Sequence, residues 1–204
     1  PKIGLNFARV LRAFLRQAPN VVLVGEIRDK ETAEVAIQAS LTGHLVFSTV
    51  HTNDAPSAVT RLLDMGVPPF LVATSLQGVL AQRLLRRLCP ECKQEEMPTP
   101  LEADLLGLSS SDKVEHPKGC PHCNRSGYRG RVGGFEHLGM NEALREALFQ
   151  SADGAEFHQI ARDSGAWMPL SEDVKRKVHS GMTTCSEMLR VTKLQSHEQS
   201  PSLT

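Results

Sequence analysis

The sequence predicts an α/β fold, and two observations carry this prediction. Residues 21–24 form a short apolar run without alternation, which is typical of a parallel strand that is covered on both faces, and the run 45–50 is the next predicted strand. Residues 30–41, between these runs, have small apolar residues at helical spacing. Strand, helix and strand in this order form a βαβ unit, for which a right-handed crossover is expected.

Helices are predicted on both sides of the βαβ unit. In residues 5–16, apolar positions recur at i, i+3, i+4, i+7 and i+8, and arginines occupy the other side of the helix. Gly43 is expected to end the helix over 30–41, since a residue that can take a positive φ is favoured there. Asp54 is a predicted N-cap, and Pro56 follows it in the first turn of the next helix.

The second half of the chain is predicted to be helical around a cysteine-rich segment. Residues 70–88 are expected to form one long helix, with leucines on its core face and Arg83, Arg86 and Arg87 on the other. Helical patterns return from residue 138, and Thr184-x-x-Glu187 has the spacing of a capping box. The polar residues 195–204 are expected to form a disordered tail.

Composition excludes several classes of protein. Lys and Arg together number 23, as do Asp and Glu, so the net charge is zero. A neutral chain argues against non-specific nucleic-acid binding. No apolar run approaches the roughly 18 residues that a transmembrane helix needs. Aromatic residues make up only 4%, so aliphatic side chains must fill the core.

Acidic residues follow the first predicted strand directly. Gly25, Glu26, Arg28 and Asp29 come after the apolar run 21–24. Ligands of open α/β sheets bind just beyond the carboxyl ends of the strands. A carboxylate at this position can hold Mg²⁺ through water, or orient a water molecule for attack on a phosphate. The alternative is a solvated strand-to-helix turn with no chemical role.

Polar residues also gather around the second predicted strand. His44 precedes it, and His51 lies in the polar stretch that closes it. The charge of a histidine can change near neutral pH, so His51 is suited to contact or sense a phosphate. His44 is equally well explained as a packing histidine. The 204 residues contain no G-x-x-x-x-G-K-[ST] loop, which would cradle the phosphates of a nucleotide.

Four of the five cysteines form two C-x-x-C pairs, which are separated by 27 residues. The four are Cys89, Cys92, Cys120 and Cys123. Two such knuckles can present four thiolates to one Zn²⁺ in a closed, structural site. The alternatives are four reduced cysteines without metal, or His122 in place of one cysteine. Cys185 stands apart and is expected to be an ordinary core or surface residue.

Several motifs in a fixed order resemble the assembly ATPases of type II secretion and type IV pili. The resemblance covers nearly the whole chain, through LRVTK at 189–193. It is carried by LRQAPN at 15–20, VGEIRD at 24–29, ETAEVAIQASLTGHLVFSTVHTNDA at 31–55, and RLLDMGV…LAQRLLRRLCPECK at 61–93. Secretion and pilus-extension members of that family often carry a tetracysteine module at this position.

The resemblance implies a RecA-like fold that uses ATP and Mg²⁺. Its Walker B motif falls on GEIRD, and its histidine box on the segment with His44 and His51. Glu26 and His51 are therefore expected to be catalytic, with His51 at the γ-phosphate. Gly25, Arg28, Asp29 and His44 are expected to contribute to cofactor binding.

The resemblance also implies a larger machine. The parent protein is expected to be a cytoplasmic homo-hexamer, peripheral to the inner membrane, that docks on platform proteins and powers secretion or pilus assembly. Walker A and the acidic box are expected upstream of Pro1, so the 204 residues alone should hydrolyse almost no ATP.

These expectations divide the chain into four segments. Residues 1–88 are a partial RecA-like core, 89–137 a zinc-binding insertion, 138–194 a helical C-terminal subdomain and 195–204 a tail. A rival hypothesis is a non-catalytic, zinc-dependent binding or regulatory module that uses Arg129 and Arg131. A third is a relic of an ATPase that lost its front half.

Overall fold

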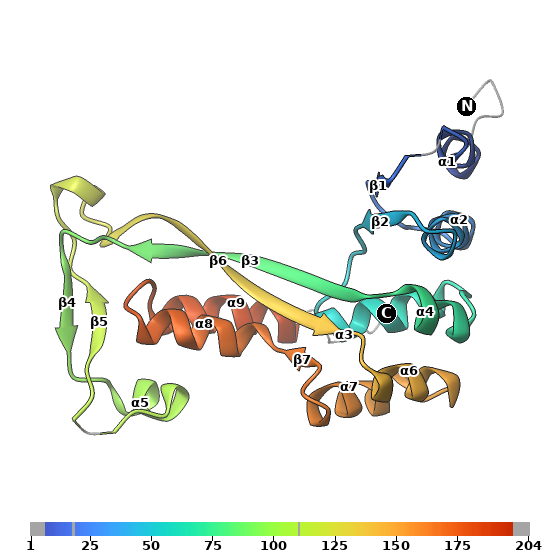
Figure 1. Ribbon diagram of the computed structural model, residues 1–204. Helices are drawn as coiled ribbons and strands as arrows, with labels where there is room; N and C mark the ends of the chain where they lie inside the picture. The colour runs from blue at the N-terminus through green and yellow to red at the C-terminus, as the bar shows by residue number, and fades with distance from the viewer. Residues whose placement is uncertain (1–6, 18, 110, 198–204) are drawn as a thin grey trace, which may run out of the picture. The chain divides into compact units, whose positions relative to one another are not determined.

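The computed structural model describes residues 7–17, 19–109 and 111–197, and the chain forms two compact units (Figure 1). Unit 1 comprises Pro1–Val79 and Leu138–Trp167. Unit 2 comprises Leu80–His137 and Met168–Thr204. Each unit is built from two stretches of chain, whereas the four predicted segments are contiguous. The division of the chain into four functional domains stays a prediction.

Unit 1 is an α/β unit, as predicted. Strands β1 and β2 pair in parallel, from Val21 beside Leu45 to Val24 beside Ser48, and α2 connects them. The elements are α1 (Phe7–Leu15), β1 (Val21–Val24), α2 (Lys30–Leu41), β2 (Leu45–Ser48), α3 (Ala55–Asp64), α4 (Pro69–Ser75), α6 (Glu142–Phe149) and α7 (Gly154–Asp163). Strand β2 ends two residues earlier than predicted.

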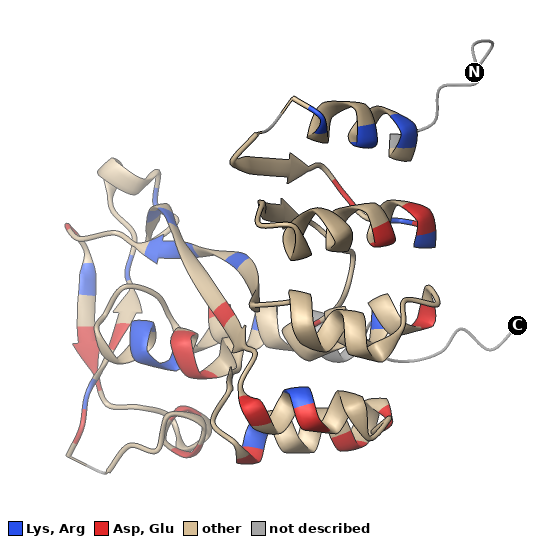
Figure 2. Ribbon diagram, turned by 45° about the vertical axis from the view of Figure 1, so that its right-hand side comes forward, with Lys and Arg blue, Asp and Glu red and all other residues tan. Residues whose placement is uncertain are grey.

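Helices α1 and α2 cover one face of the strand pair. Val22 and Val24 are buried there against Ala8 and Leu11 of α1 and Val35 of α2. In Figure 2, α1 carries only basic charges, and α2 carries both acidic and basic ones. Arg12 of α1 reaches Glu31 of α2, with 3.1 Å between Nη1 and Oε1. Arg9 and Arg12 are exposed, as predicted for the arginine-bearing side of the first helix.

The other face of the strand pair is exposed within the described part of the chain. We call Val21, Leu23, Leu45 and Phe47 the open face, because each is at least half exposed and Leu23 is 76% exposed. The register places Leu23 beside Phe47, so these side chains form one patch. The prediction that both faces are covered is therefore wrong here: α1 and α2 lie against one side only.

The remaining helices of unit 1 share a second core. Val59 of α3, Val72 of α4, Leu144 of α6 and Phe157 of α7 are all buried in it. Asp54 caps α3 as predicted, because its carboxylate accepts a hydrogen bond from the backbone N–H of Ser57 at 2.8 Å. This cap fixes the segment that follows β2 and carries His51.

Unit 2 contains a long β-ribbon that packs on two helices. Leu85 of β3 is buried against Val174 of α8 and Met188 of α9. Strand β6 lies between β3 and β7 in the sheet. The elements are β3 (Gly78–Leu88), β4 (Lys93–Glu96), α5 (Pro100–Leu106), β5 (Val114–Pro117), a 3₁₀ turn (Pro121–Cys123), β6 (Tyr128–Gly139), β7 (Trp167–Met168), α8 (Leu170–His179) and α9 (Cys185–His197).

The predicted helix over 70–88 is wrong. The chain forms the short helix α4 and then the strand β3, which begins at Gly78. Its residues favour a helix intrinsically, but helix propensity is a weak preference that tertiary contacts override. Pairing with β6 and burial of Leu85 and Leu88 provide those contacts. Arg83, Arg86 and Arg87 therefore lie on a strand.

The end of the described chain is helical. Thr184 caps α9 as predicted, since its Oγ1 accepts a hydrogen bond from the backbone N–H of Glu187 at 3.3 Å. Helix α9 continues to His197, so the predicted tail begins too early, and residues 198–204 lie outside the described part. Across the described ranges, no helix is both long and apolar enough to cross a bilayer.

Candidate functional site

Glu26 lies beyond the carboxyl end of β1 and meets two basic side chains. Its Oε2 is 2.6 Å from Nε of Arg28 and 3.2 Å from Nε2 of His51. The hydrogen bond from Arg28 is the main cause that lowers the pKa of Glu26, and His51 adds to it. Glu26 is therefore a carboxylate at neutral pH, and its side chain remains 35% exposed.

The strand ends that carry these residues are joined by hydrogen bonds. The backbone N–H of Ile27 donates to the carbonyl oxygen of Thr49 at 2.9 Å. The hydroxyl of Thr49 donates to the carbonyl oxygen of Gly25 at 2.7 Å. These bonds fix the loop of Glu26 to the segment that leads to His51, so the two side chains meet at one edge of the strand pair.

The structure separates the two predicted histidines. His51 follows the carboxyl end of β2, whereas His44 precedes its amino end, so they lie at opposite ends of the strand. Nδ1 of His44 is 3.0 Å from the carbonyl oxygen of Ala39 and 3.2 Å from the hydroxyl of Thr42. His44 thus closes the turn after α2, and its predicted role in cofactor binding stays a prediction.

Asp29 caps helix α2. One carboxylate oxygen accepts from the backbone N–H of Thr32 at 2.8 Å, and the other accepts from the Thr32 hydroxyl at 3.1 Å. Both oxygens therefore have partners in the helix start. At Gly25, no described atom beyond its chain neighbours lies within 4 Å of where a Cβ would be. The structure itself therefore leaves room for a side chain there.

The four predicted cysteine ligands converge in unit 2. Their sulfur atoms all lie within 4.8 Å of one another, and His122 is exposed and outside the group. Cys89 and Cys120 are 3.9 Å apart, and Cys92 and Cys123 are 3.8 Å apart. A tetrahedral zinc site with Zn–S bonds of about 2.3 Å has sulfur atoms about 3.8 Å apart. A disulfide would need about 2.0 Å.

Backbone N–H groups point at the sulfur of Cys123. Those of Cys120 and Gly127 each donate to it at 3.2 Å, and they lower its pKa to about 6. Burial raises the pKa of Cys92 to about 12, so that thiol ionises at neutral pH only beside a cation. The spacing, the burial and the N–H donors fit a bound metal ion. Cys185, by contrast, is an ordinary core residue, as expected.

A comparison with protein families matches the Type II/IV secretion system protein family over residues 1–190. The chain belongs to this family. Among its relatives, Type II secretion system ATPase E of Vibrio cholerae serotype O1 is 51% identical over 201 residues, which cover 95% of this chain and 38% of that protein. Type II secretion system protein E of Pectobacterium carotovorum is 50% identical over 192 residues, or 94% of this chain.

Solved structures show the same fold. The pilus retraction motor PilT with bound ADP is 26% identical, with a TM-score of 0.63 over 91% of this chain and 43% of that chain. The Legionella pneumophila ATPase DotB is 21% identical, with a TM-score of 0.63 over 92% of this chain. The chain spans 38% of the length of the relatives named above.

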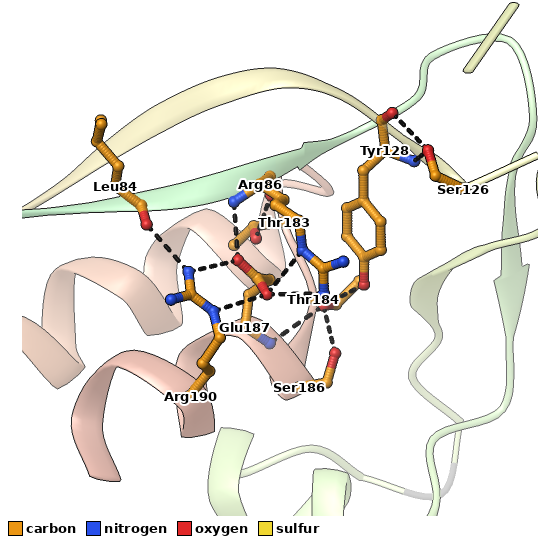
Figure 3. Close-up of polar contacts among 9 residues, drawn as sticks. All are labelled: Leu84, Arg86, Ser126, Tyr128, Thr183, Thr184, Ser186, Glu187 and Arg190. Carbon is orange, nitrogen blue, oxygen red and sulfur yellow. Dashed lines mark hydrogen bonds and ion pairs between the residues drawn. The ribbon is translucent and has the colours of Figure 1, made fainter. Parts of the chain in front are cut away.

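One buried carboxylate was not anticipated as a centre of interactions. Glu187 of α9 is fully buried in unit 2 and contacts Arg86 and Arg190 (Figure 3). Burial opposes its ionisation, but the hydrogen bonds from the two arginines outweigh that effect and lower its pKa to about 2. The sequence contained a signal: Glu187 lies four residues before the buried Val191, on a face that enters the core.

Proposed function

We propose that this chain forms part of an ATPase that powers type II secretion, or a related pilus-assembly machine. The meeting of Glu26 and His51 at the carboxyl edge of a parallel strand pair carries the proposal. Family membership supports it, as does a relative of similar sequence whose name includes ATPase. The 38% share of the relatives' length means that other parts of such a motor are expected beyond these residues.

Each residue at this edge has a proposed role. Bound ATP with Mg²⁺ supplies the phosphoryl group that water attacks. Glu26, ionised at neutral pH, orients that water and accepts its proton. His51, whose side chain is 83% exposed, contacts the γ-phosphate. Arg28 lowers the pKa of Glu26 and, with Gly25, shapes the strand end, while Asp29 holds the start of α2.

The tetracysteine site is proposed to hold Zn²⁺ as a structural ion. Four thiolates complete a tetrahedral shell and leave no open position for substrate, so the ion stabilises the fold and takes no part in hydrolysis. Three of the sulfur–sulfur distances, at 3.8 to 3.9 Å, support this proposal. We further propose that the intact protein works as a cytoplasmic homo-hexamer on inner-membrane platform proteins.

A chimera tests the proposed ATPase. The chain would replace the matching 38% of Type II secretion system ATPase E from Vibrio cholerae, and phosphate release would be measured. We expect ATP turnover by the chimera and almost none by the 204 residues alone, because they lack a phosphate-cradling loop. A folded, metal-loaded chimera without turnover would instead favour a non-catalytic zinc module.

A further inference from the structure

Glu187 is held by a set of contacts that extends beyond an ion pair. Its carboxylate accepts from the backbone N–H of Arg86 at 2.8 Å and from Nε of Arg86 at 3.0 Å. Arg190, one turn further along α9, donates from Nη2 at 2.8 Å and from Nε at 3.0 Å. A fully buried carboxylate is tolerated only with such partners, so the loss of either arginine would be strongly destabilising.

The ring of Tyr128 continues this set of contacts toward β6. The guanidinium carbon of Arg86 lies 4.1 Å from the centre of the ring. The hydroxyl oxygen of Tyr128 is 3.1 Å from Oγ1 of Thr184, which caps α9 and accepts from the backbone N–H of Glu187 (Figure 3). Tyr128 therefore contacts both the arginine that holds Glu187 and the residue that starts its helix.

The same two strands lead directly into the cysteine knuckles. Cys89 follows the last residue of β3, and its backbone N–H donates to the carbonyl oxygen of Gly127 at 3.0 Å. Gly127 precedes Tyr128, and its N–H donates to the sulfur of Cys123 at 3.2 Å. Ser126 donates to the carbonyl oxygen of Cys123 at 2.6 Å and accepts from the N–H of Tyr128 at 3.2 Å.

The position of Gly127 leaves little freedom at this junction. Its φ is +76°, and a Cβ there would lie 2.4 Å from Cβ of Pro117. A glycine is needed for that backbone conformation and that close approach. Tyr128 therefore directly follows a residue whose backbone contacts both Cys89 and Cys123.

We propose that Arg86 and Tyr128 couple metal binding at the four cysteines to the packing of the first turn of α9, and that Glu187 transmits this coupling. The proposal rests on the metal site of the proposed function. With the ion bound, the knuckles fix Gly127 and Cys89, so Tyr128 and Arg86 are held in place for Glu187 and Thr184. Without the ion, the thiols lose their common partner, the knuckles relax, and the first turn of α9 loosens.

Coupling of this kind is reciprocal, so it predicts two effects of equal size. Metal binding should protect the start of α9, and weakening the Glu187 contacts should lower metal affinity. Cys185, the first residue of α9, is 4% exposed and lies outside the metal cluster, so it reports on that helix start. Its reaction with a thiol reagent can be separated from that of the other cysteines by peptide mass spectrometry.

The experiment measures Zn²⁺ affinity by chelator competition and the labelling rate of Cys185 with and without Zn²⁺. Glu187→Gln should weaken the affinity about fivefold or more, and it should reduce the protection of Cys185 by Zn²⁺ by the same factor. Tyr128→Phe removes only the hydroxyl contact and should act in the same direction with a smaller effect. If Glu187→Gln does not fold, the Tyr128→Phe variant alone tests the coupling.

Asp173→Asn is the matched control. Asp173 is another mostly buried carboxylate of unit 2, with its side chain 15% exposed, and it accepts from the N–H of Phe135 at 2.8 Å. Its substitution should leave Zn²⁺ affinity unchanged. If the Glu187 and Tyr128 variants also bind Zn²⁺ like the wild type, the coupling is wrong although the metal site stands. If the wild type binds no Zn²⁺, the metal site itself is wrong and the coupling falls with it.

Discussion

Nε2 of His51 lies 3.2 Å from Oε2 of Glu26, although 25 positions separate the two residues in the sequence. The parallel pairing of β1 and β2 accounts for this meeting, because it brings the ends of both strands to one edge. An imidazole and an ionised carboxylate at such an edge can act together on a water molecule and a phosphate. The first prediction concerns this carboxylate.

Glu26→Gln should abolish most ATP turnover in the chimera with the Vibrio cholerae relative. A glutamine keeps the shape but cannot accept a proton, and loss of a general base typically lowers kcat by about 10²- to 10⁴-fold. Nucleotide affinity, measured with a fluorescent ATP analogue, should change little. Glu34→Gln, which changes a partly exposed acid of α2, is the control. Equal ATP turnover by both variants would show that Glu26 does not act as the general base.

Arg28→Gln should shift the acid side of the pH–rate profile. Arg28 lowers the pKa of Glu26, so in the wild type the carboxylate stays ionised at a pH below its ordinary titration range. Without Arg28 the pKa rises, and activity should be lost at a higher pH as the solution is acidified. The measurement is kcat/KM of the chimera from pH 4 to 8. An unmoved acid limb would show that Glu26 ionisation does not limit the rate.

Substitutions at Asp29 distinguish a helix cap from a cofactor ligand. Asp29→Ala should lower the free energy of unfolding by about 1 kcal/mol, because the N–H of Thr32 loses its acceptor. Asp29→Asn keeps an acceptor oxygen and should restore most of that stability in urea unfolding. We expect it to restore ATPase activity in the chimera as well. Normal stability with low activity would instead indicate that the charge of Asp29 binds the cofactor.

Cys92→Ser should remove one of four metal ligands, whereas Cys185→Ser should not affect metal binding. Both cysteines are buried, but only Cys92 belongs to the cluster. Co²⁺ in a four-thiolate site gives a strong charge-transfer absorption, which Cys92→Ser should weaken and Cys185→Ser should retain. The thermal midpoint should fall on metal removal in the wild type, because an ion that binds only the folded state stabilises it. Identical spectra for the two variants would contradict the site.

Much of unit 1 could be predicted from local patterns. The apolar runs, the cap at Asp54 and the acidic strand end all depend on neighbouring residues, and the structure has each of them, although β2 ends two residues earlier than predicted. The cysteine cluster was equally accessible, since two knuckles need only turn toward one point. The caps, the strands and each C-x-x-C knuckle depend on a few neighbouring residues, whereas the contact between the two knuckles spans 31 positions.

What could not be predicted depends on distant contacts. Residues 78–88 have helical propensity but form β3, because β6 pairs with them from about 50 residues away in the chain. Glu187 fits a capping box, yet its carboxylate turns to Arg86, 101 positions earlier. Nothing near Glu187 in the sequence identifies that partner, so the contact between Glu187 and Arg86 becomes visible only with the fold.

The open face of β1 and β2 has a practical consequence for anyone who handles these 204 residues in isolation. The four apolar side chains, with Leu23 beside Phe47, form an exposed patch that favours association. Because the net charge of the chain is zero, electrostatic repulsion between molecules does not oppose this association. Purified samples should aggregate as the protein concentration rises, and light scattering should detect the aggregates. The double substitution Leu23→Thr and Phe47→Thr should preserve the pairing of β1 with β2 and reduce aggregation.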